Sequence, residues 1–358
     1  MSETIYEAAK KKGMSRRDFM KLCTAVGAIM GIDFASTDKV VHAMETKEKL
    51  PVLWLNFQEC TGCTESFIRA DHPTAGEILL DMISLEYQDT LIAPAGHAAE
   101  AAKKAMMEKY HGRYILAVEG AVPTDREFCC IGGESALDQL REAAEGAKAV
   151  IAWGSCAAWG GIQAAKPNPT NAIPIDRVIS SKPILKVPGC PPIPDVMAGV
   201  LAHIITFDEL PEVDHLGRVK AFYGQRIHDN CNRRAYFDAG LFVESFDDEG
   251  AKKGYCLYKV GCKGPTTYNS CANMRWNGGT SYPIQSGNPC IGCAEKDFWD
   301  NDHFFERTAR IPGTQTTVSP DKIGLGVTAA ALVGVAGHAA ITAGFKKHDE
   351  KKAEEQEK

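Results

Sequence analysis

The sequence has no surplus of positive charge and no internal repeat. It holds 40 Lys and Arg against 46 Asp and Glu, which gives a formal net charge of −6. A chain without a basic field has little to attract the phosphates of nucleic acid, so we expect no nucleic-acid partner. Its 358 residues suffice for roughly two domains, and a 44% share of hydrophobic residues suffices for ordinary buried cores.

Residues 1–43 have the pattern of an export signal. Arg16 and Arg17 precede an apolar stretch, 22–32, that is shorter than the ~20 residues a membrane-spanning helix needs. Small residues just before Met44 offer a cleavage site. This combination is typical of a twin-arginine signal peptide; a chance arginine pair before a buried helix is the alternative. Removal of the signal would leave a chain that starts near Met44.

The other end of the chain carries an apolar segment, 323–345, without any Asp, Glu, Lys or Arg. As a helix it would cover about 34 Å, enough for a ~30 Å hydrocarbon core; a buried helix of a soluble protein is the alternative. Lysines in the charged tail, 346–358, place that tail in the cytoplasm. With 313–322 as a linker, we expect a body on the periplasmic face of the inner membrane, held by one transmembrane helix.

The segment 44–210 alternates apolar runs with helical patterns. The apolar runs are typical of buried parallel strands and lie at 51–57, 90–95, 113–120, 149–155 and 184–189. The helical patterns lie at 98–110, 134–147 and 194–207. This alternation predicts an α/β domain with a flavodoxin-like, doubly wound parallel sheet. The next segment, 211–312, is dense in Gly, Pro, Asn and Asp, and such an irregular domain needs another source of order.

Four cysteines follow predicted strands. Cys60 and Cys63 form a Cys-x-x-Cys pair after the first strand, and Cys156 and Cys190 follow two later ones. Because the carboxyl ends of parallel strands lie along one edge of a sheet, we expect the four thiols to converge. Four thiolates suit a zinc ion or a 4Fe–4S cluster, and the flanking glycines and prolines favour the bulkier cluster. Buried, unreactive cysteines are the alternative.

The irregular domain holds two more candidate ligand sets. One set has four members, His228, Cys231, Cys256 and Cys262, and the other has three, Cys271, Cys290 and Cys293. Four ligands suit zinc or a 4Fe–4S cluster, three suit a 3Fe–4S cluster, and zinc at each site remains an alternative. Bound metal would also explain how an irregular segment stays folded.

Three of the 13 cysteines fall outside these sets. Cys23 lies in the predicted signal peptide and would be removed with it. Cys129 and Cys130 are adjacent in the sequence, and we interpret them as small buried hydrophobic residues.

A series of motifs along nearly the whole chain resembles the small subunit of membrane-bound nickel–iron uptake hydrogenases. The motifs are RRDFMK, ECTGCTES, GSCAAWGG, PGCPP, RIHDNC, CLYKVGCKGPTTYN and PCIGC. The resemblance implies a proximal 4Fe–4S cluster on the first cysteine set and a distal 4Fe–4S cluster on the set that contains His228. It implies a medial 3Fe–4S cluster on the three-cysteine set, with Pro283 near the missing corner.

The resemblance also implies a function. A separate large subunit would hold the nickel–iron site and oxidise H2. This chain would pass the electrons from the proximal to the medial to the distal cluster, and on to a membrane cytochrome b and quinone. The chain would thus belong to a hydrogen:quinone oxidoreductase of anaerobic respiration. A periplasmic interaction protein stapled by zinc and a stand-alone ferredoxin-like carrier are the rival hypotheses.

Single residues carry further expectations from the resemblance. Glu59 is similar to a family glutamate proposed in proton transfer; a carboxylate that only faces the partner at the surface or makes hydrogen bonds is the alternative. Oxygen-tolerant members of the family have two extra cysteines around the proximal cluster, where this chain has Gly62 and Gly161. We therefore expect an ordinary four-cysteine cluster and an enzyme that air inactivates.

The apolar C-terminal segment carries one stripe with a polar residue in it. Gly326, Ala330, Gly334, His338 and Thr342 recur every four residues and share one side of a helix. Small residues let a second helix pack closely, and a histidine in hydrocarbon usually faces a partner or cofactor. We therefore hypothesise that this face docks on a cytochrome b subunit, where His338 meets a haem or the quinone; a lipid-facing histidine without a role is the alternative.

Overall fold

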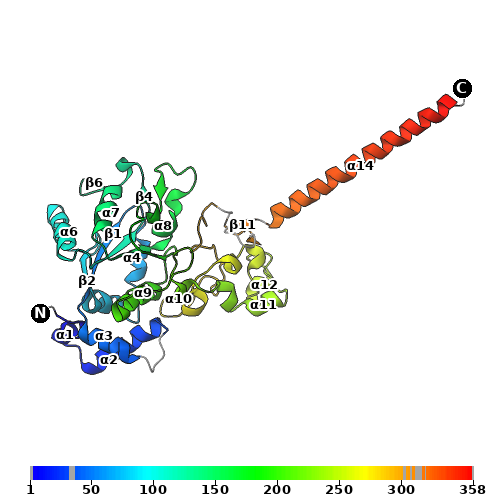
Figure 1. The fold of residues 1–358 in the computed structure, drawn as a ribbon. Helices are drawn as coiled ribbons and strands as arrows, with labels where there is room; N and C mark the ends of the chain where they lie inside the picture. Colours follow the sequence, from blue (N-terminus) through cyan, green and yellow to red (C-terminus); the bar gives the residue numbers. More distant parts are fainter. Residues whose placement is uncertain are drawn as a thin grey trace.

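The computed structural model describes residues 3–31, 37–300, 304–306, 309–310, 317–318 and 320–356. Within these ranges an α/β domain leads into a turn-rich domain, and one long helix projects beyond both (Figure 1).

The α/β domain is built on five parallel strands in the order β2-β1-β3-β7-β9. The strands are β1 Leu50–Asn56, β2 Ile83–Tyr87, β3 Ile115–Glu119, β7 Ala149–Trp153 and β9 Ile184–Val187. If these five alone are numbered along the chain, the order is 2-1-3-4-5, as in flavodoxin-like sheets. The predicted parallel α/β sheet is therefore confirmed.

Helices cover both faces of the sheet. Successive strand residues point to opposite sides, so each strand contributes to two cores. On β1, Leu53 and Leu55 join the core beneath α6 and α7, whereas Val52 and Trp54 join the core beneath α9. The helices of this domain are α4 Gly62–Phe67, α5 Ala75–Glu77, α6 His97–Lys109, α7 Ala136–Glu145, α8 Gly154–Trp159 and α9 Pro194–Phe207. A π-helix, Ile78–Met82, leads into β2. The cores therefore fix the sheet edge at which the cysteines lie.

Short elements decorate this domain. The two-residue strands are β4 Val122–Pro123, which pairs with β8 Ala172–Ile173, and β5 Cys130–Ile131, which pairs with β6 Glu134–Ser135. The 3₁₀ helices are Arg126–Phe128, Ile162–Ala164 and Ile175–Arg177.

One predicted strand is wrong. Residues 90–95 form turns and bends instead of a strand, and Leu91 is 41% exposed. The strand is β2, with the sequence ISLEY, whose three central residues are only half-buried. An edge strand needs no continuous apolar run, so its mixed sequence gave a weaker pattern than the apolar residues that follow it.

The N-terminal segment is folded onto the α/β domain. Its helices are α1 Ile5–Lys11, α2 Arg16–Ile29 and α3 Thr37–Thr46. Phe19 and Leu22 are buried in the same core as α9. Ala43 and Met44, which flank the predicted cleavage site, are buried within α3. The end of the predicted apolar stretch, residue 32, lies outside the described residues, and signal removal stays a prediction.

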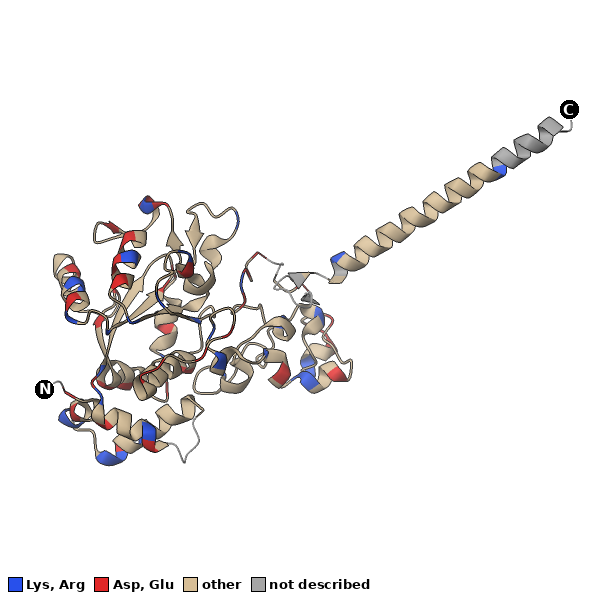
Figure 2. Ribbon diagram, viewed as in Figure 1, with Lys and Arg blue, Asp and Glu red and all other residues tan. Residues whose placement is uncertain are grey.

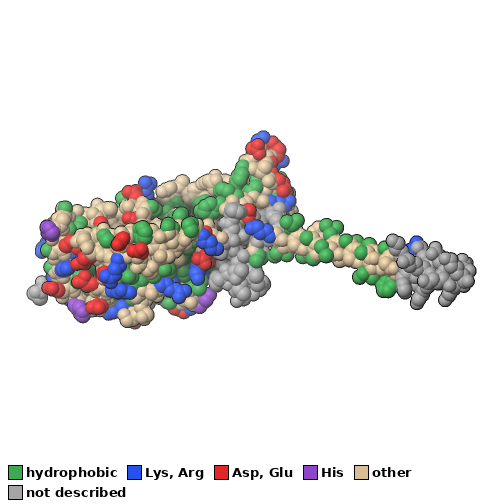
Figure 3. All heavy atoms as spheres, turned by 90° about the horizontal axis from the view of Figure 1, so that it is seen from above, with side chains coloured by type: hydrophobic (Ala, Val, Ile, Leu, Met, Phe, Trp, Pro, Cys, Tyr) green, Lys and Arg blue, Asp and Glu red, His purple; other side chains and the backbone are tan. Residues whose placement is uncertain are grey.

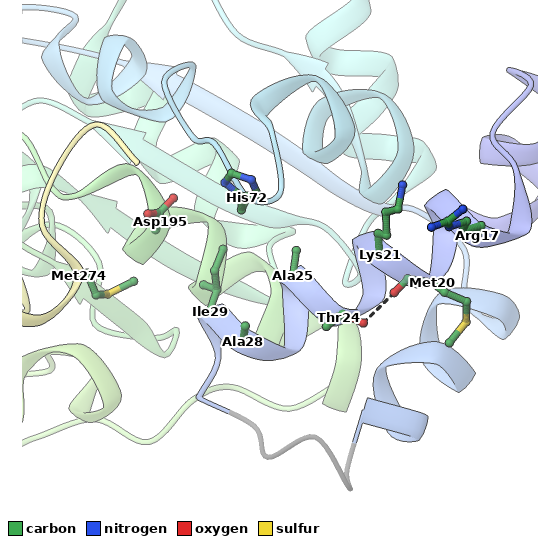
Figure 4. A pocket seen from close by; sticks show the side chains of 10 residues that line it. All are labelled: Arg17, Met20, Lys21, Thr24, Ala25, Ala28, Ile29, His72, Asp195 and Met274. Atoms are coloured by element: carbon green, nitrogen blue, oxygen red, sulfur yellow. Dashed lines mark hydrogen bonds between the residues drawn. The ribbon is translucent and has the colours of Figure 1, made fainter. Parts of the chain in front are cut away.

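Helix α2 also forms one wall of an open groove of about 840 Å³ (Figure 4). Met20 and Thr24 line it from α2, and His72, Asp195 and Met274 line it from the rest of the chain. If the signal peptide is removed as predicted, this wall goes with it. In that case the groove would not be part of the mature protein.

The turn-rich domain has no strand of its own within the described residues from 223 to 300. Its helical pieces are α10 Lys220–Tyr223, η6 Ile227–Asn230, α11 Arg234–Asp238, α12 Glu249–Lys252, η7 Tyr258–Val260, η8 Gly264–Thr266 and α13 Cys271–Met274. Each has three to five residues. The described residues of this segment are thus rich in turns and short helices, and its role as a cluster domain stays a prediction.

Buried polar contacts tie this domain to the sheet. Arg218, whose side chain is 3% exposed, pairs with Asp214 at 2.8 Å and with Glu295 at 3.1 Å. The indole N–H of Trp159 donates to the carbonyl of Ala294 at 3.1 Å. These contacts hold the segment around Cys293 against the α/β domain.

The C-terminal part begins with a pair of two-residue antiparallel strands, β10 Ala309–Arg310 and β11 Thr317–Val318. Helix α14, Pro320–Gln356, follows and starts inside the predicted linker, much of which lies outside the described residues. The part Lys322–Lys346 is long and apolar enough to cross a membrane, and none of its most apolar window is buried. Figures 2 and 3 show charge only at the ends of that part and hydrophobic side chains along it.

Candidate metal-cluster sites

The first candidate site is a cavity of about 80 Å³ at the carboxyl ends of the strands. Segments that follow β1, β3, β7 and β9 all contribute to its lining. The four cysteines predicted for the proximal cluster all line it: Cys60, Cys63, Cys156 and Cys190. The sheet topology thus brings together thiols that are up to 130 positions apart in the sequence (from 60 to 190).

Glycines leave space around these thiols. A Cβ on Gly161 would lie 2.5 Å from Sγ of Cys156, and one on Gly154 would collide with Sγ of Cys63. Both glycines also have positive φ, +66° and +77°, which side chains rarely adopt. The backbone therefore approaches the sulfurs closely, as a site for a bulky inorganic group requires.

Two carboxylates line the same cavity. Glu119, at the end of β3, is 1% exposed and accepts hydrogen bonds from the backbone N–H groups of Cys63, at 2.9 Å, and Thr64, at 3.1 Å. It therefore orients the start of α4. Burial, and next the charge of Glu119, raise the pKa of Glu59 to about 7.

Glu119 was missed in the sequence. The signal was present, since it is the one charged residue of the strand ILAVE. A buried strand that ends in a carboxylate at the ligand-binding edge of a sheet indicates a functional or orienting group.

The second candidate site is a more apolar cavity of about 220 Å³ in the turn-rich domain. All three predicted medial ligands line it: Cys271, Cys290 and Cys293. Pro283 and Tyr282 line the same cavity. Proline offers no metal ligand, so the arrangement has three thiols and an apolar fourth side.

The predicted distal residues also lie near one another. Burial is the largest cause that raises the pKa of the Cys262 thiol to about 11. The charges of Cys231 and Cys256, when ionised, add to this effect. A Cβ on Gly264 would lie 3.5 Å from Sγ of Cys262 and 3.9 Å from the backbone nitrogen of His228. The His228 ring lies edge-on to Phe237, with centroids 4.6 Å apart.

Successive sites are in direct contact. Ser155, which lines the first cavity, donates its hydroxyl proton to the carbonyl of Cys293 in the second. Burial raises the pKa of the Cys293 thiol, and the nearby backbone of Cys190, from the first site, opposes this. The backbone N–H of Cys290, in the second site, donates to Sγ of Cys262 at 3.4 Å. The three sites therefore form one continuous series.

Burial keeps these thiols protonated in the absence of a cation. It raises the pKa of Cys190 and of Cys271 to about 12, and that of Cys156 to about 11. Neighbouring thiols add to the effect at Cys190. A bound group must therefore supply positive charge to hold them as thiolates.

The cysteine sets suit multi-iron clusters better than a single metal ion. In the described part of the chain no three His, Cys, Asp or Glu side chains are grouped closely enough to hold one metal ion.

The remaining candidate residues lie outside the three sets. The prediction that Cys129 and Cys130 are buried is wrong for Cys130, which is exposed because the short β5–β6 hairpin lies at the surface; Cys129 is half-buried. His338 is exposed on α14.

The comparisons with known proteins agree with this geometry. Residues 223–306 match the family described as the C-terminal part of the NiFe/NiFeSe hydrogenase small subunit, and 60–204 match the family of the NADH ubiquinone oxidoreductase 20 Kd subunit. The chain belongs to the small subunits of nickel–iron hydrogenases. It is 56% identical to the uptake hydrogenase small subunit of Azotobacter vinelandii, over 95% of this chain and 96% of that one.

Further relatives support the same assignment. The hydrogenase-1 small chain of Escherichia coli K12 is 52% identical over 98% of this chain and 96% of its own length. Among solved structures, the NiFeSe hydrogenase of Desulfomicrobium baculatum matches with a TM-score of 0.68 and 37% identity, over 72% of this chain and 99% of that chain. That of Desulfovibrio vulgaris Hildenborough gives 0.67 and 35%, over 73% and 99%.

Proposed function

We propose that this chain is the electron-relay subunit of a membrane-bound nickel–iron hydrogenase. A large subunit would hold the nickel–iron site and oxidise H2, and this chain would lead the electrons away. Iron–sulfur clusters, when bound, supply the chemistry of taking up and releasing single electrons. The observation that carries the proposal is the series of three ligand sets in mutual contact, because one isolated set could be structural whereas a series suits a relay.

The residues fit such clusters. The first cavity is lined by four thiols, its glycines leave room beside the sulfurs, and the buried thiols need a cation to ionise. We assign a proximal 4Fe–4S cluster to Cys60, Cys63, Cys156 and Cys190. We assign a distal 4Fe–4S cluster to His228, Cys231, Cys256 and Cys262. We assign a medial 3Fe–4S cluster to Cys271, Cys290 and Cys293, with Pro283 at the missing corner.

Two carboxylates of this chain would act beside the proximal ligands. Glu119 holds the α4 turn that carries Cys63. Glu59 lies beside the proximal set with a pKa of about 7, so near neutral pH it can hold or give up a proton at its carboxyl oxygens. This suits a proton path beside the partner subunit, which supports the family-based role of Glu59.

The two ends of the chain bear on its location and therefore on its electron acceptor. We propose export by the twin-arginine signal, a body on the periplasmic face of the inner membrane, and anchoring by α14. The distal site would then deliver electrons to a cytochrome b subunit and quinone. The apolar, unburied part of α14 supports the anchor.

The complex isolated from membranes tests the function. Metal analysis and electron paramagnetic resonance (EPR) should find nickel in a co-purifying large subunit, and two 4Fe–4S clusters and one 3Fe–4S cluster in this chain. Zinc without iron, or no partner subunit, would overturn the proposal. We also expect air to inactivate H2 oxidation, because Gly62 and Gly161 leave the proximal set with four cysteines; sustained activity in air would contradict that expectation.

His338 tests the exit through the membrane. In His338→Ala we expect H2-dependent reduction of a soluble dye to be unchanged, since the cluster ligands are untouched, and quinone reduction to fall roughly tenfold, an effect of ~1.4 kcal/mol. Thr328→Ala on the same helix is the control. Unchanged quinone reduction with the cytochrome still bound would leave His338 without a role.

A further inference from the structure

Tyr282 connects two of the ligand sets. Its side chain lines the medial cavity beside Pro283, and the residue is only 3% exposed. Its hydroxyl lies 3.5 Å from Sγ of Cys231, in the distal set, and donates toward it. One buried phenol therefore contacts both the medial and the distal site.

The hydroxyl is held in place by the residue after Cys231. The backbone N–H of Asn232 donates to the Tyr282 oxygen at 3.3 Å, and the phenol proton can go to Oδ1 of Asn232 at 2.7 Å or to Sγ of Cys231. A thiolate is the stronger acceptor of the two because it is charged. The phenol at 3.5 Å is therefore placed to donate to the sulfur when Cys231 serves as a cluster ligand.

The sulfur of Cys231 then has two donors. The second is the backbone N–H of Arg233, at 3.4 Å. Hydrogen bonds to ligand sulfurs favour the more negative redox state of a cluster, and so raise its reduction potential. The backbone donor is available to any sequence, whereas the phenol is a property of this side chain.

We propose that Tyr282 is a positioning residue that raises the reduction potential of the distal site through its hydrogen bond to Cys231. The inference rests on the proposed function, and it adds a residue that tunes the exit of electrons. Oxidation of H2 at the partner subunit yields two protons and two electrons. Each electron that reaches the distal site adds one negative charge there and breaks no bond, so a donor at Cys231 stabilises the reduced form.

The test is an EPR-monitored redox titration of the whole complex with Tyr282→Phe, which removes only the hydroxyl. We expect the equilibrium constant for reduction of the distal cluster to fall about tenfold, equivalent to 59 mV for a one-electron couple. The medial potential should stay where it is. Tyr236→Phe, which removes a hydroxyl from the ring beside Tyr255 in the same domain, is the matched control and should shift neither.

A second variant covers the case in which Tyr282→Phe loses the distal cluster. Asn232→Ala removes the competing acceptor of the phenol proton and keeps the backbone N–H that donates to the phenol oxygen. We therefore expect the Tyr282–Cys231 hydrogen bond to persist, which pulsed EPR detects as a coupling of the distal cluster to the phenol deuteron. The distal potential should not fall below that of the parent. A normal distal signal with unchanged potential in Tyr282→Phe overturns the inference, and so does loss of the deuteron coupling in Asn232→Ala. A parent complex without any distal cluster signal would instead overturn the proposed function.

Discussion

The α/β domain and the turn-rich domain use their buried residues differently. In the former, β3 and β7 are buried at every position and are paired to neighbours on both sides. In the latter, no helical piece from 223 to 300 exceeds five residues, and the buried residues include Cys256, Cys262, Cys271 and Cys290. Hydrophobic burial and strand pairing order the first domain, whereas the core of the second mixes apolar residues such as Val243 and Leu257 with the cysteines proposed as ligands.

Removal of the proposed clusters should give the largest difference in stability between the two domains. In full-length chain produced under iron limitation, we expect backbone amides from 223 to 300 to lose roughly 100-fold in exchange protection, equivalent to about 2.7 kcal/mol. Amides of β3 and β7 should remain protected. Hydrogen exchange followed by mass spectrometry measures both, and restored iron and sulfide provide the control. Equal protection of both domains without iron would contradict a role of clusters in folding.

Loss of the tie between the domains should have the next largest effect. Arg218→Ala removes the guanidinium that pairs with Asp214 and Glu295, whose side chains are 16% and 12% exposed. Both carboxylates keep backbone hydrogen bonds, so we expect a cost of about 2 kcal/mol of unfolding free energy, below that of breaking a fully buried ion pair. Lys104→Ala breaks the exposed pair with Glu134 and should cost at most about 1 kcal/mol. Urea unfolding of both variants measures the difference. Similar midpoints would show that the buried network adds no stability.

The sequence could predict the domain that has periodic patterns better than the other. Helix α9 was predicted at its observed bounds, 194–207, because an apolar helix with Pro at its start has a clear pattern. Strand β2 was missed because an edge strand mixes polar and apolar residues. The helices of the turn-rich domain are too short for any period to show.

The candidate site was predictable in its cysteines and less so in its surroundings. Strand ends gave the convergence of the first set, since the sheet topology determines it. The contact of Tyr282 with Cys231 spans 51 positions between two irregular segments, and no local pattern encodes such a contact. For Glu119 the strand pattern indicates a functional carboxylate, but it does not reveal the partners Cys63 and Thr64, which follow a different strand.

Replacement of His228, the proposed histidine ligand, should separate electron transfer from folding. A thiolate in His228→Cys adds one negative charge to the distal site and lowers its potential. We expect H2-to-quinone and H2-to-dye rates to fall about tenfold, while exchange protection from 223 to 300 is retained. Stopped-flow reduction and hydrogen exchange measure the two. Unchanged rates with an intact cluster would refute the role of His228.

The smallest effect should come from a half-buried histidine that lines neither of the two cysteine cavities. His203, in α9, packs against Phe207 with ring centroids 4.8 Å apart, and burial lowers its pKa below the ordinary value of about 6.5, although Glu209 opposes this. The folded chain therefore binds this proton less readily than the unfolded chain. The stability from this group is complete above pH 6.5 and falls as the pH drops toward the folded pKa.

His203→Gln should remove that part of the pH dependence, because glutamine has no proton to bind in this range. Urea midpoints between pH 7.5 and 5, followed by the fluorescence of the buried Trp54 and Trp153, measure it. The exposed His97→Gln is the control and should leave the pH dependence of the parent in place. Parallel curves for parent and His203→Gln would show that His203 is not held neutral by the fold.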